Sequence, residues 1–415
     1  MEPWFLSYAL LGASVAGLAP ILLPISVGES GSVADIGLVM GAFNLGGLSA
    51  PLWGGIADRR GLHRLLLICG LLATALGLVA FPFVDSFSGR LVLALVQGIG
   101  AASAATVANL FIVEAHPQSE WDERIGWLQT FYGGGQVLGL LLAGLTTGPV
   151  LRTGFLLAAG ITIAAIIPAI FMRSNPRTIR LTRPVLKTPS RHAEVSAGSP
   201  QSFYHHLNVA ALRHAFRSFV SPLGIFLAAW LISFAGAAAF FSLYPVLMKS
   251  VFDVDPALSS VGFAVAATIG LFVYAPAGHW SGRFGAMRVL NGALTIRVLA
   301  FVVLILLGTF ALSNRGWMAL GGFGFVVIAW SLLSVAGTEI TAQFSKDHEG
   351  EGLGLFNAST AIAGVVGAVV GGWVAGRWGY QVVPVLGIIG SAIGILLMWV
   401  VTRMARKNET VKEEG

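Results

Sequence analysis

Long apolar runs alternate with short polar segments along the whole chain. Each run has about 20 residues or more, the length that an α-helix needs to cross a hydrocarbon core of ~30 Å. Because lipid offers the backbone no hydrogen bonds, each run is predicted to be a transmembrane helix. The pattern predicts twelve such helices, near residues 4–27, 33–56, 64–84, 91–113, 124–147, 152–172, 219–248, 258–279, 287–312, 317–342, 352–376 and 381–402.

A longer polar segment, residues 173–218, divides these runs into two sets of six. The pattern therefore predicts an N-terminal six-helix bundle over residues 1–172, and a C-terminal bundle with a short tail over residues 219–415. Apolar residues between Phe203 and Phe219 fall roughly on one helical face, which favours an amphipathic helix on the membrane surface. A solvated basic linker is the alternative.

The composition is typical of a membrane protein, since 56% of the residues are hydrophobic and only 11% are charged. The first run has no basic region before it and no cleavage site after it, so we interpret it as a mature helix and not a signal peptide. Most of the 25 lysines and arginines fall in the connector, the tail and the loops on the same side. This bias predicts that both termini are cytoplasmic and favours a multi-pass protein of the cell inner (cytoplasmic) membrane. It also explains the net charge of +6 without a nucleic-acid partner.

The sequence lacks paired haem ligands within its spans and the phosphate-binding motif of an ATP-driven pump. The eight histidines lie in loops or in the connector, so no pair is placed to ligate haem inside the membrane. No lysine follows a glycine, so the chain has no phosphate-binding GK[ST] motif. The single cysteine, Cys69, excludes an internal disulfide. We therefore expect neither an enzyme nor a bound cofactor or metal.

The two halves repeat a charged motif between their second and third helices. The stretch GGIADRRGLHRLLL begins at Gly54, and GHWSGRFGAMRVL begins at Gly278. Their alignment pairs Arg59 with Arg283, Gly61 with Gly285 and Arg64 with Arg288, and it matches Asp58 with Gly282. A second repeat pairs Gly139 with Gly367 and Gly144 with Gly372. Parallel repeats of six helices predict a rocking transporter with its site between the halves.

The first motif resembles the signature of the major facilitator superfamily. That signature runs Gly-x-Leu-Ala-Asp-Arg-x-Gly-Arg and then a basic residue, and the stretch from Gly54 to Arg64 matches it with Leu62 in place of the second arginine. The resemblance implies an all-α fold of twelve helices and a secondary transporter that works by alternating access. It also implies a central cavity lined by the first, second, fourth and fifth helices of each half. Drug antiporters of this family usually have an arginine and a proline where this chain has Ala94 and Leu140.

The resemblance also implies that the charged motif is a latch that closes the cytoplasmic side. Its aspartate would face the start of the eleventh helix, whose partial positive charge stabilises a carboxylate. Acidic residues open the fifth and eleventh helices, and they are the expected partners of arginines from the opposite half. The predicted latch residues are Asp58, Arg59, Arg60, Gly61, Arg64, Arg283, Arg288 and the rim carboxylates Glu114 and Glu339. For the arginines, a role in membrane orientation alone is the alternative.

Polar and aromatic stripes indicate candidate cavity residues. On the fifth helix, Gln129, Tyr132 and Gln136 follow the i, i+3, i+7 spacing of one helical face. The other candidates, on the seventh, tenth and eleventh helices, are Trp230, Tyr244, Trp330 and Asn357. Small and polar residues also hold membrane helices together, which is the alternative role for these stripes.

The leading hypothesis is efflux of small amphipathic or lipophilic compounds. No aspartate or glutamate lies near the middle of a predicted span, so a strongly charged substrate would lack a counter-charge. Arg297, near the middle of the ninth helix, is expected to pair with carbonyls or hydroxyls of a neighbouring helix; binding of an anionic substrate is the alternative. Uptake or export of a small organic anion or sugar is the second hypothesis, and a non-transporting receptor is the third.

The expected partners are therefore a small-molecule substrate and the lipid bilayer. A proton is the candidate coupling ion, although the lack of a central carboxylate weakens the argument for direct coupling. We expect a monomer that binds neither nucleic acid nor metal.

Overall fold

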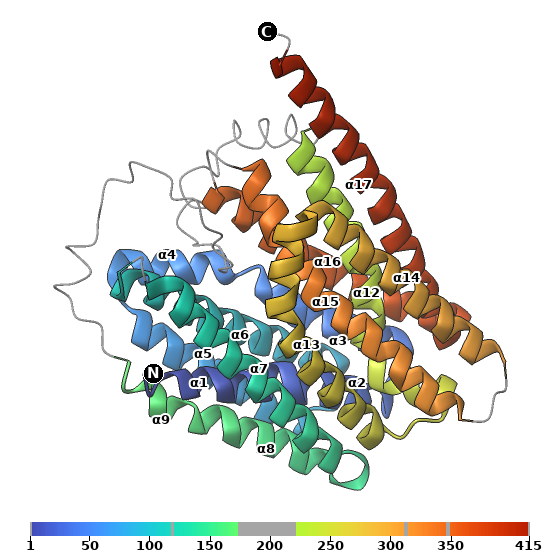
Figure 1. Cartoon of the computed structure of the whole chain (residues 1–415). Coiled ribbons are helices and arrows are strands. Elements are labelled where there is room, and N and C mark those ends of the chain that lie inside the picture. Colours follow the sequence, from blue (N-terminus) through green and yellow to red (C-terminus); the bar gives the residue numbers. More distant parts are fainter. Residues whose placement is uncertain (1, 118–119, 173–220, 311–313, 346–348, 414–415) are drawn as a thin grey trace.

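The computed structural model describes residues 2–117, 120–172, 221–310, 314–345 and 349–413. Every regular element in these ranges is a helix (Figure 1). The amphipathic helix expected between Phe203 and Phe219 lies outside the described residues.

The helices of the first half follow the predicted apolar runs. The first run is one continuous span whose centre is a π-helix, and the second run is broken between Gly47 and Ala50. The elements are α1 (Phe5–Leu11), the π-helix η1 (Gly12–Leu18), α2 (Ala19–Gly28), α3 (Val33–Gly47), α4 (Ala50–Arg60), α5 (His63–Ala80), α6 (Phe87–Ala115), α7 (Trp121–Leu145), α8 (Leu151–Ala164) and α9 (Ile166–Ala169).

The helices of the second half are longer and less interrupted. They are α12 (Pro222–Phe252), α13 (Pro256–Phe284), α14 (Ala286–Thr309), α15 (Arg315–Phe344), α16 (Glu349–Trp378) and α17 (Val383–Glu413). Eleven of the described helical segments are long and apolar enough to cross a membrane. Helix α7 has the length of a span but carries Gln129, Gln136 and three successive glycines, which lower its hydropathy. The all-α architecture expected from the sequence is confirmed.

Local sequence signals begin several of these helices. Ser32 caps α3, since its hydroxyl accepts a hydrogen bond from the backbone N–H of Asp35, while the Asp35 carboxylate accepts one from the Ser32 N–H at 2.7 Å. Pro222 and Pro256 stand at the first positions of α12 and α13. A missing N–H costs nothing there, because the first turn of a helix has no partner for it.

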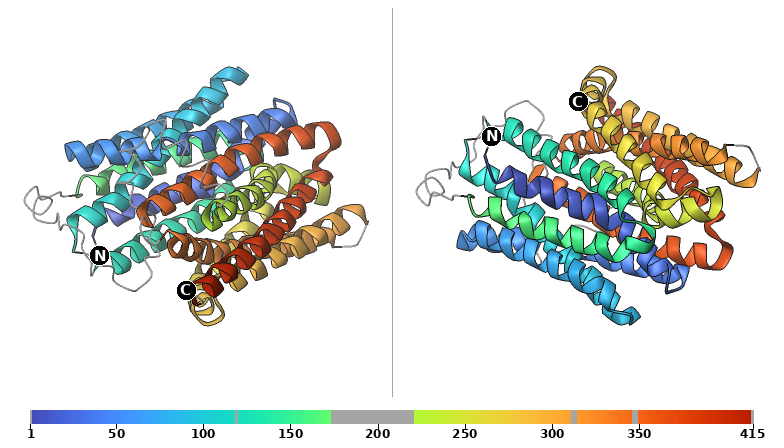
Figure 2. Two further views of the ribbon diagram at one scale, coloured as in Figure 1. Left: turned by 90° about the horizontal axis from the view of Figure 1, so that it is seen from above. Right: turned by 90° about the horizontal axis from the view of Figure 1, so that it is seen from below.

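Buried apolar residues of the described helices form three clusters, and these show how the halves meet. We call the membrane side with residues 2, 172 and 221 the connector side, and the opposite side the far side. The largest cluster lies on the far side and draws on both halves, for example Leu22 and Phe240. Each of the others lies on the connector side within one half. The halves therefore pack together on the far side and part toward the connector side (Figure 1), and they lie side by side in Figure 2.

Repeated glycines let the fifth helix of each half touch the first helix of that half. A Cβ at Gly139 of α7 would lie 2.0 Å from the carbonyl oxygen of Ala13 in η1. A Cβ at Gly367 of α16 would lie 2.3 Å from the carbonyl oxygen of Ala235 in α12. Backbone approach this close is a main source of helix association in lipid, because lipid is as apolar as the helix surfaces.

The second pair of repeated glycines lies between the halves. A Cβ at Gly144 of α7 would lie 3.1 Å from the carbonyl oxygen of Ala257 in α13, and a Cβ at Gly372 of α16 would lie 2.6 Å from the Cα of Gly37 in α3. The sequence repeat therefore corresponds to two matching contacts across the interface. One joins α7 to α13, and the other joins α16 to α3.

Both repeats of the charged motif contain a glycine at the end of a helix, and the backbone conformation explains why. Gly61 and Gly285 end α4 and α13 with positive φ angles of 63° and 89°. Residues with a side chain are strained in this region, whereas glycine adopts it readily.

We expect Gly139→Ala to lower the melting temperature of the purified protein. The added methyl group overlaps the backbone of Ala13, and overpacking of this kind costs about 1–3 kcal/mol. Gly134→Ala on the same helix is the matched control, because its Cβ meets nothing within 4 Å. That change should be neutral or stabilising by about 0.5–1 kcal/mol. Thermal unfolding in detergent measures both variants, and equal melting temperatures would contradict the role of the Gly139 contact.

Candidate functional site

Hydrogen bonds join the halves on the far side and near the middle of the helices. Ser260 of α13 donates to the carbonyl oxygen of Leu140 in α7 at 2.5 Å. Asn44 of α3 donates through Nδ2 to the carbonyl oxygen of Gly364 in α16 at 3.2 Å. Residues nearer the connector side on these helices lie where the halves part.

Two of the predicted cavity residues lie at a similar depth on opposite halves. Gly133 of α7 packs against the side chain of Leu271 in α13. Ser331 of α15 donates to the carbonyl oxygen of Gly270, the residue before Leu271, at 2.9 Å. Tyr132 and Trp330, the neighbours of Gly133 and Ser331, are therefore at similar depth, just on the connector side of the closing contacts.

The first half contributes a chain of neutral hydrogen bonds at this depth. Asn109 of α6 donates through Nδ2 to the hydroxyl of Tyr8 in α1 at 3.3 Å. Gln129 of α7 donates through Nε2 to Oδ1 of Asn109 at 3.2 Å. The rings of Tyr8 and Tyr132 pack with their centroids 4.8 Å apart. Three helices thus hold one polar network, in which Gln129 is exposed and Tyr132 is half-buried.

The second half contributes an aromatic cluster, which we define as Trp230, Phe234, Trp330 and Phe356. The ring centroids of Trp230 lie 6.0 Å from Trp330 and 4.5 Å from Phe356, and those of Phe234 and Trp330 lie 5.0 Å apart. Trp230 donates through Nε1 to the hydroxyl of Thr360 at 2.7 Å, which fixes its ring. Phe234 and Trp330 are half-buried, whereas Trp230 and Phe356 lie behind them.

The structure separates one predicted cavity residue from the others. Tyr244 is buried in the far-side cluster, where its hydroxyl donates to the carbonyl oxygen of Ser259 at 2.8 Å and its ring stacks on Phe323. In this conformation it supports the closed side and does not lie in the aromatic cluster. Gln136 is half-buried one to two turns from Tyr132 toward the far side, and Asn357 is exposed on α16.

Other members of these two groups are absent from the predicted set. Phe234 follows Trp230 by one helical turn, so its spacing was an available signal. Phe356 precedes Asn357 and lies on another face of α16. Tyr8 is a single aromatic residue in an apolar run, and no spacing distinguishes it from a core residue.

Comparison with known proteins identifies the fold. The family model of the Major Facilitator Superfamily matches residues 4–343 and 331–415. The chain belongs to this family. NorA, the quinolone resistance protein of Staphylococcus aureus, is 23% identical over 400 residues, which are 95% of this chain and 94% of NorA.

Solved structures of the Major Facilitator Superfamily share the architecture at low identity. The nucleoside transporter NupG matches with a TM-score of 0.70 and 12% identity over 97% of each chain. A bacterial homologue of the human lysosomal transporter Spinster, in an inward-facing and occupied conformation, matches with a TM-score of 0.70 and 14% identity. That match covers 97% of this chain and 96% of the homologue.

The superfamily motif lies on the connector side in both repeats. Arg60 and Arg64 are exposed on either side of the turn at Gly61. The side chains of Asp58, Arg59 and Glu114 lie outside the described residues.

In the second repeat, the predicted latch residues interact within their own half. The guanidinium of Arg283 lies 5.4 Å from the ring centroid of Phe284, and Arg288 donates to the Phe284 carbonyl oxygen at 3.4 Å. The Glu339 carboxylate accepts hydrogen bonds from the Ser281 hydroxyl and, at 3.1 Å, from the amide of Gln343.

The acidic loop before α7 is also paired within its own half. Arg124 binds Glu2 at 2.6 Å and Glu120 at 2.8 Å. Nε2 of His116 lies 2.9 Å from the same Glu2 carboxylate, and burial lowers the pKa of His116. This network ties the N-terminal segment to the loop between α6 and α7. Glu120 is thus bound to Arg124 while the halves are parted, and not to an arginine of the other half.

Arg297 lies on α14, which packs against α15 and α17. It is only 1% exposed. Its Nε and Nη2 atoms have no hydrogen-bond partner among the described residues, and neither does the hydroxyl of Ser391 on α17. The expected pairing of these two nitrogens with carbonyls or hydroxyls of a neighbouring helix is therefore not formed.

We expect Arg297→Met to raise the melting temperature. Replacing a buried charge by an apolar side chain of similar length removes an uncompensated desolvation cost without leaving a large cavity. Arg377→Met, at an exposed position on α16, is the control and should change the melting temperature little. A marked loss of stability confined to the Arg297 variant would show that this guanidinium has a stabilising partner.

Proposed function

We propose that this member of the Major Facilitator Superfamily is a secondary active transporter that exports small amphipathic or lipophilic compounds by alternating access. The observation that carries the proposal is the aromatic cluster of the second half, at the depth of the neutral network of the first half. The similarity to NorA, a quinolone resistance protein, agrees with it.

The chemistry of the two groups favours an apolar ligand with few polar atoms. Aromatic rings offer a large contact area and require no counter-charge, so a planar lipophilic compound packs well on Phe234 and Trp330. The amides of Gln129 and Asn109 supply a few hydrogen bonds that orient it. All of these side chains are neutral, so a strongly charged ligand would lose its hydration without compensation.

The conformation agrees with loading from the connector side. The basic residues of the loops predict that this side faces the cytoplasm. The homologue of Spinster that shares the fold was solved in an inward-facing conformation. An exporter in this state would take its substrate from the cytoplasm or the inner leaflet of the membrane.

A neutral, hydroxyl-rich substrate such as a sugar is the second candidate. The hydrogen-bonded network of Tyr8, Asn109 and Gln129 favours it, because amide and hydroxyl groups recognise hydroxyls well. In that case the aromatic cluster would stack on the apolar face of the ring. The two candidates differ in which half of the site dominates binding.

We expect Trp330→Ala and Phe234→Ala to weaken transport of a neutral lipophilic dye. Burying an aromatic side chain contributes about 1.5–3 kcal/mol, so the KM should rise by about tenfold or more. Tyr244→Phe is the control: it loses the hydrogen bond to Ser259 in the far-side cluster, and it should lower thermal stability while leaving KM unchanged. Dye transport into inside-out proteoliposomes measures KM.

The same proteoliposomes test the other functions. Saturable transport of a sugar or of a dicarboxylate, with the dye ignored, would replace the export proposal. Gln129→Leu should then impair transport more than Trp330→Ala does. Binding of a ligand without transport of any compound would indicate a receptor.

We also infer that Asp58 latches the connector side in the closed state. Asp58→Asn should favour the open state by roughly two- to fivefold, since a carboxylate at a helix N-terminus contributes ~0.3–1 kcal/mol. Spin labels at the exposed positions Leu65 and Phe284 report the separation of the halves on this side. Gly282→Asn, at the matching position of the second repeat, is the control. Identical distance distributions for the wild type and Asp58→Asn would disprove the latch.

A further inference from the structure

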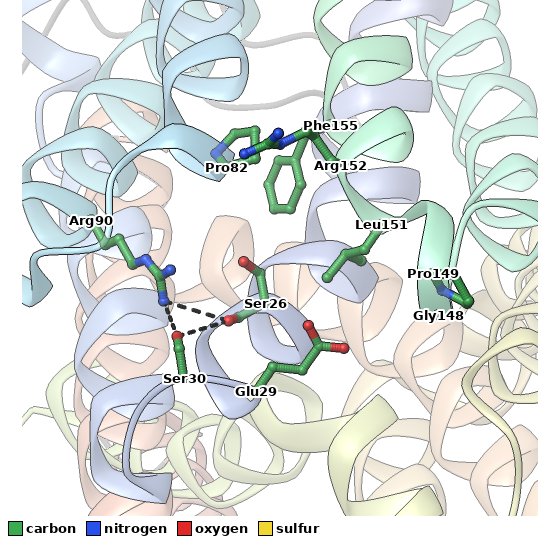
Figure 3. A pocket seen from close by; sticks show the side chains of 10 residues that line it. All are labelled: Ser26, Glu29, Ser30, Pro82, Arg90, Gly148, Pro149, Leu151, Arg152 and Phe155. Atoms are coloured by element: carbon green, nitrogen blue, oxygen red, sulfur yellow. Dashed lines mark hydrogen bonds between the residues drawn. The ribbon is translucent and has the colours of Figure 1, made fainter.

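A polar cavity of about 470 Å³ lies at the far-side end of the first half, away from the site between the halves. The spans Phe5–Gly28, His63–Phe83, Phe87–Val113 and Gly148–Ala169 all have an end beside it. Figure 3 shows Arg90, Arg152 and Glu29 around this cavity. The cavity therefore lies where helices leave the hydrocarbon core, at the depth of lipid headgroups.

Hydrogen bonds hold Arg90 in place, whereas Arg152 is exposed and rests against an aromatic ring. Arg90 is 9% exposed and donates through Nε to the carbonyl oxygen of Val84 at 2.8 Å. Its Nη1 donates to the hydroxyl of Ser30 and, at 3.5 Å, to the carbonyl oxygen of Ser26. The guanidinium of Arg152 lies 4.6 Å from the ring centroid of Phe83. A ligand would thus meet one guanidinium group that folding has already ordered, and a second, exposed one beside it.

The second half has an arginine at the position that corresponds to Arg90, and this arginine has a carboxylate partner. Arg315 is the counterpart of Arg90 in the second half, because the two are 225 residues apart, the same offset that separates Glu114 from Glu339. Each of the two arginines lies near the start of the fourth helix of its half. Arg315 forms an ion pair with Asp253, at the end of α12. Arg315 therefore has a carboxylate partner in direct contact, although both side chains are partly or largely exposed.

In the first half, the corresponding arginine contacts a serine. Arg90 binds Ser30, and its nearest carboxylate oxygen belongs to Asp85 at 3.9 Å, on a fully exposed side chain. An ion pair with an exposed partner at this distance is weak. Glu29, one residue before Ser30, forms no ion pair within the described part of the chain. Charges of both signs therefore face the cavity without strong partners.

We propose that this cavity binds a phosphate group that carries a primary amine, the headgroup chemistry of phosphatidylethanolamine. Arg90 and Arg152 match the phosphate, because guanidinium groups form charge-assisted hydrogen bonds with phosphate oxygens. Glu29 matches the ammonium group, because the N–H groups of a primary ammonium can donate hydrogen bonds to a carboxylate. A quaternary amine has no N–H group to donate. The position at the ends of four spans makes a phospholipid of the far-side leaflet the source of this headgroup, and soluble phosphoethanolamine has the same chemistry.

The test measures the melting temperature of the delipidated full-length protein in detergent against added lipid. Phosphatidylethanolamine should raise the melting temperature at lower concentration than phosphatidylcholine with the same acyl chains, because binding to the folded state stabilises it. Glu29→Gln and Arg152→Gln should each weaken this effect by about tenfold or more, the loss expected for one charge-assisted hydrogen bond. Both side chains are exposed, so these variants are expected to fold, whereas Arg90 is buried.

Arg315→Gln is the matched control, since it removes the corresponding arginine of the other half and should retain the full response to phosphatidylethanolamine. An equal response to the two lipids, or an unchanged response in both cavity variants, would overturn the proposal. A parallel titration with soluble phosphoethanolamine distinguishes the sources. If it raises the melting temperature as strongly as the lipid does, the site binds the free headgroup; if it has no effect, the site binds the lipid.

Discussion

Close approach of helix backbones at glycines is the contact on which this fold depends. Lipid surrounds the helices with a solvent as apolar as their own surfaces, so burial of leucine or valine gives little preference for one neighbour over another. Gly139 and Gly367 remove the side chain where the fifth helix of each half touches the first. Each half then has its fifth helix against its first, and this contact fixes which faces of α7 and of α16 are turned away from the first helix.

The contacts between the halves follow from the same principle and determine the conformation. Gly37 and Gly372 bring α3 against α16, and Gly144 brings α7 against α13, all on the far side. No comparable cluster joins the halves on the connector side in the described residues, where each bundle has its own core. Rocking of the halves about the far-side contacts would therefore change the exposure of Gln129 and Trp330 while leaving each bundle intact.

The sequence predicts the helices well because hydropathy is a local property, whereas depth in the membrane and contacts across the interface are not. The spacing of Gln129 and Tyr132 predicts that they share one face, and that of Trp230 and Tyr244 predicts the same. These last two residues, however, are ~21 Å apart along the helix at 1.5 Å per residue. Trp230 lies in the aromatic cluster, and Tyr244 lies in the far-side cluster. Tyr8 joins the polar network of the first half through its contacts with α6 and α7, which no pattern within the first helix reveals.

The two halves share a backbone plan and differ in the chemistry placed on it. At the centre, one half supplies amides and phenols and the other supplies indole and phenyl rings. At the far-side ends, Arg315 has a carboxylate partner and Arg90 has a serine. A repeat constrains helix packing equally in both halves, because the same glycine contacts must form in each. Side chains that do not take part in these contacts are free of that constraint, so differences between equivalent positions are a physical guide to where a chain built from two repeats can bind other molecules.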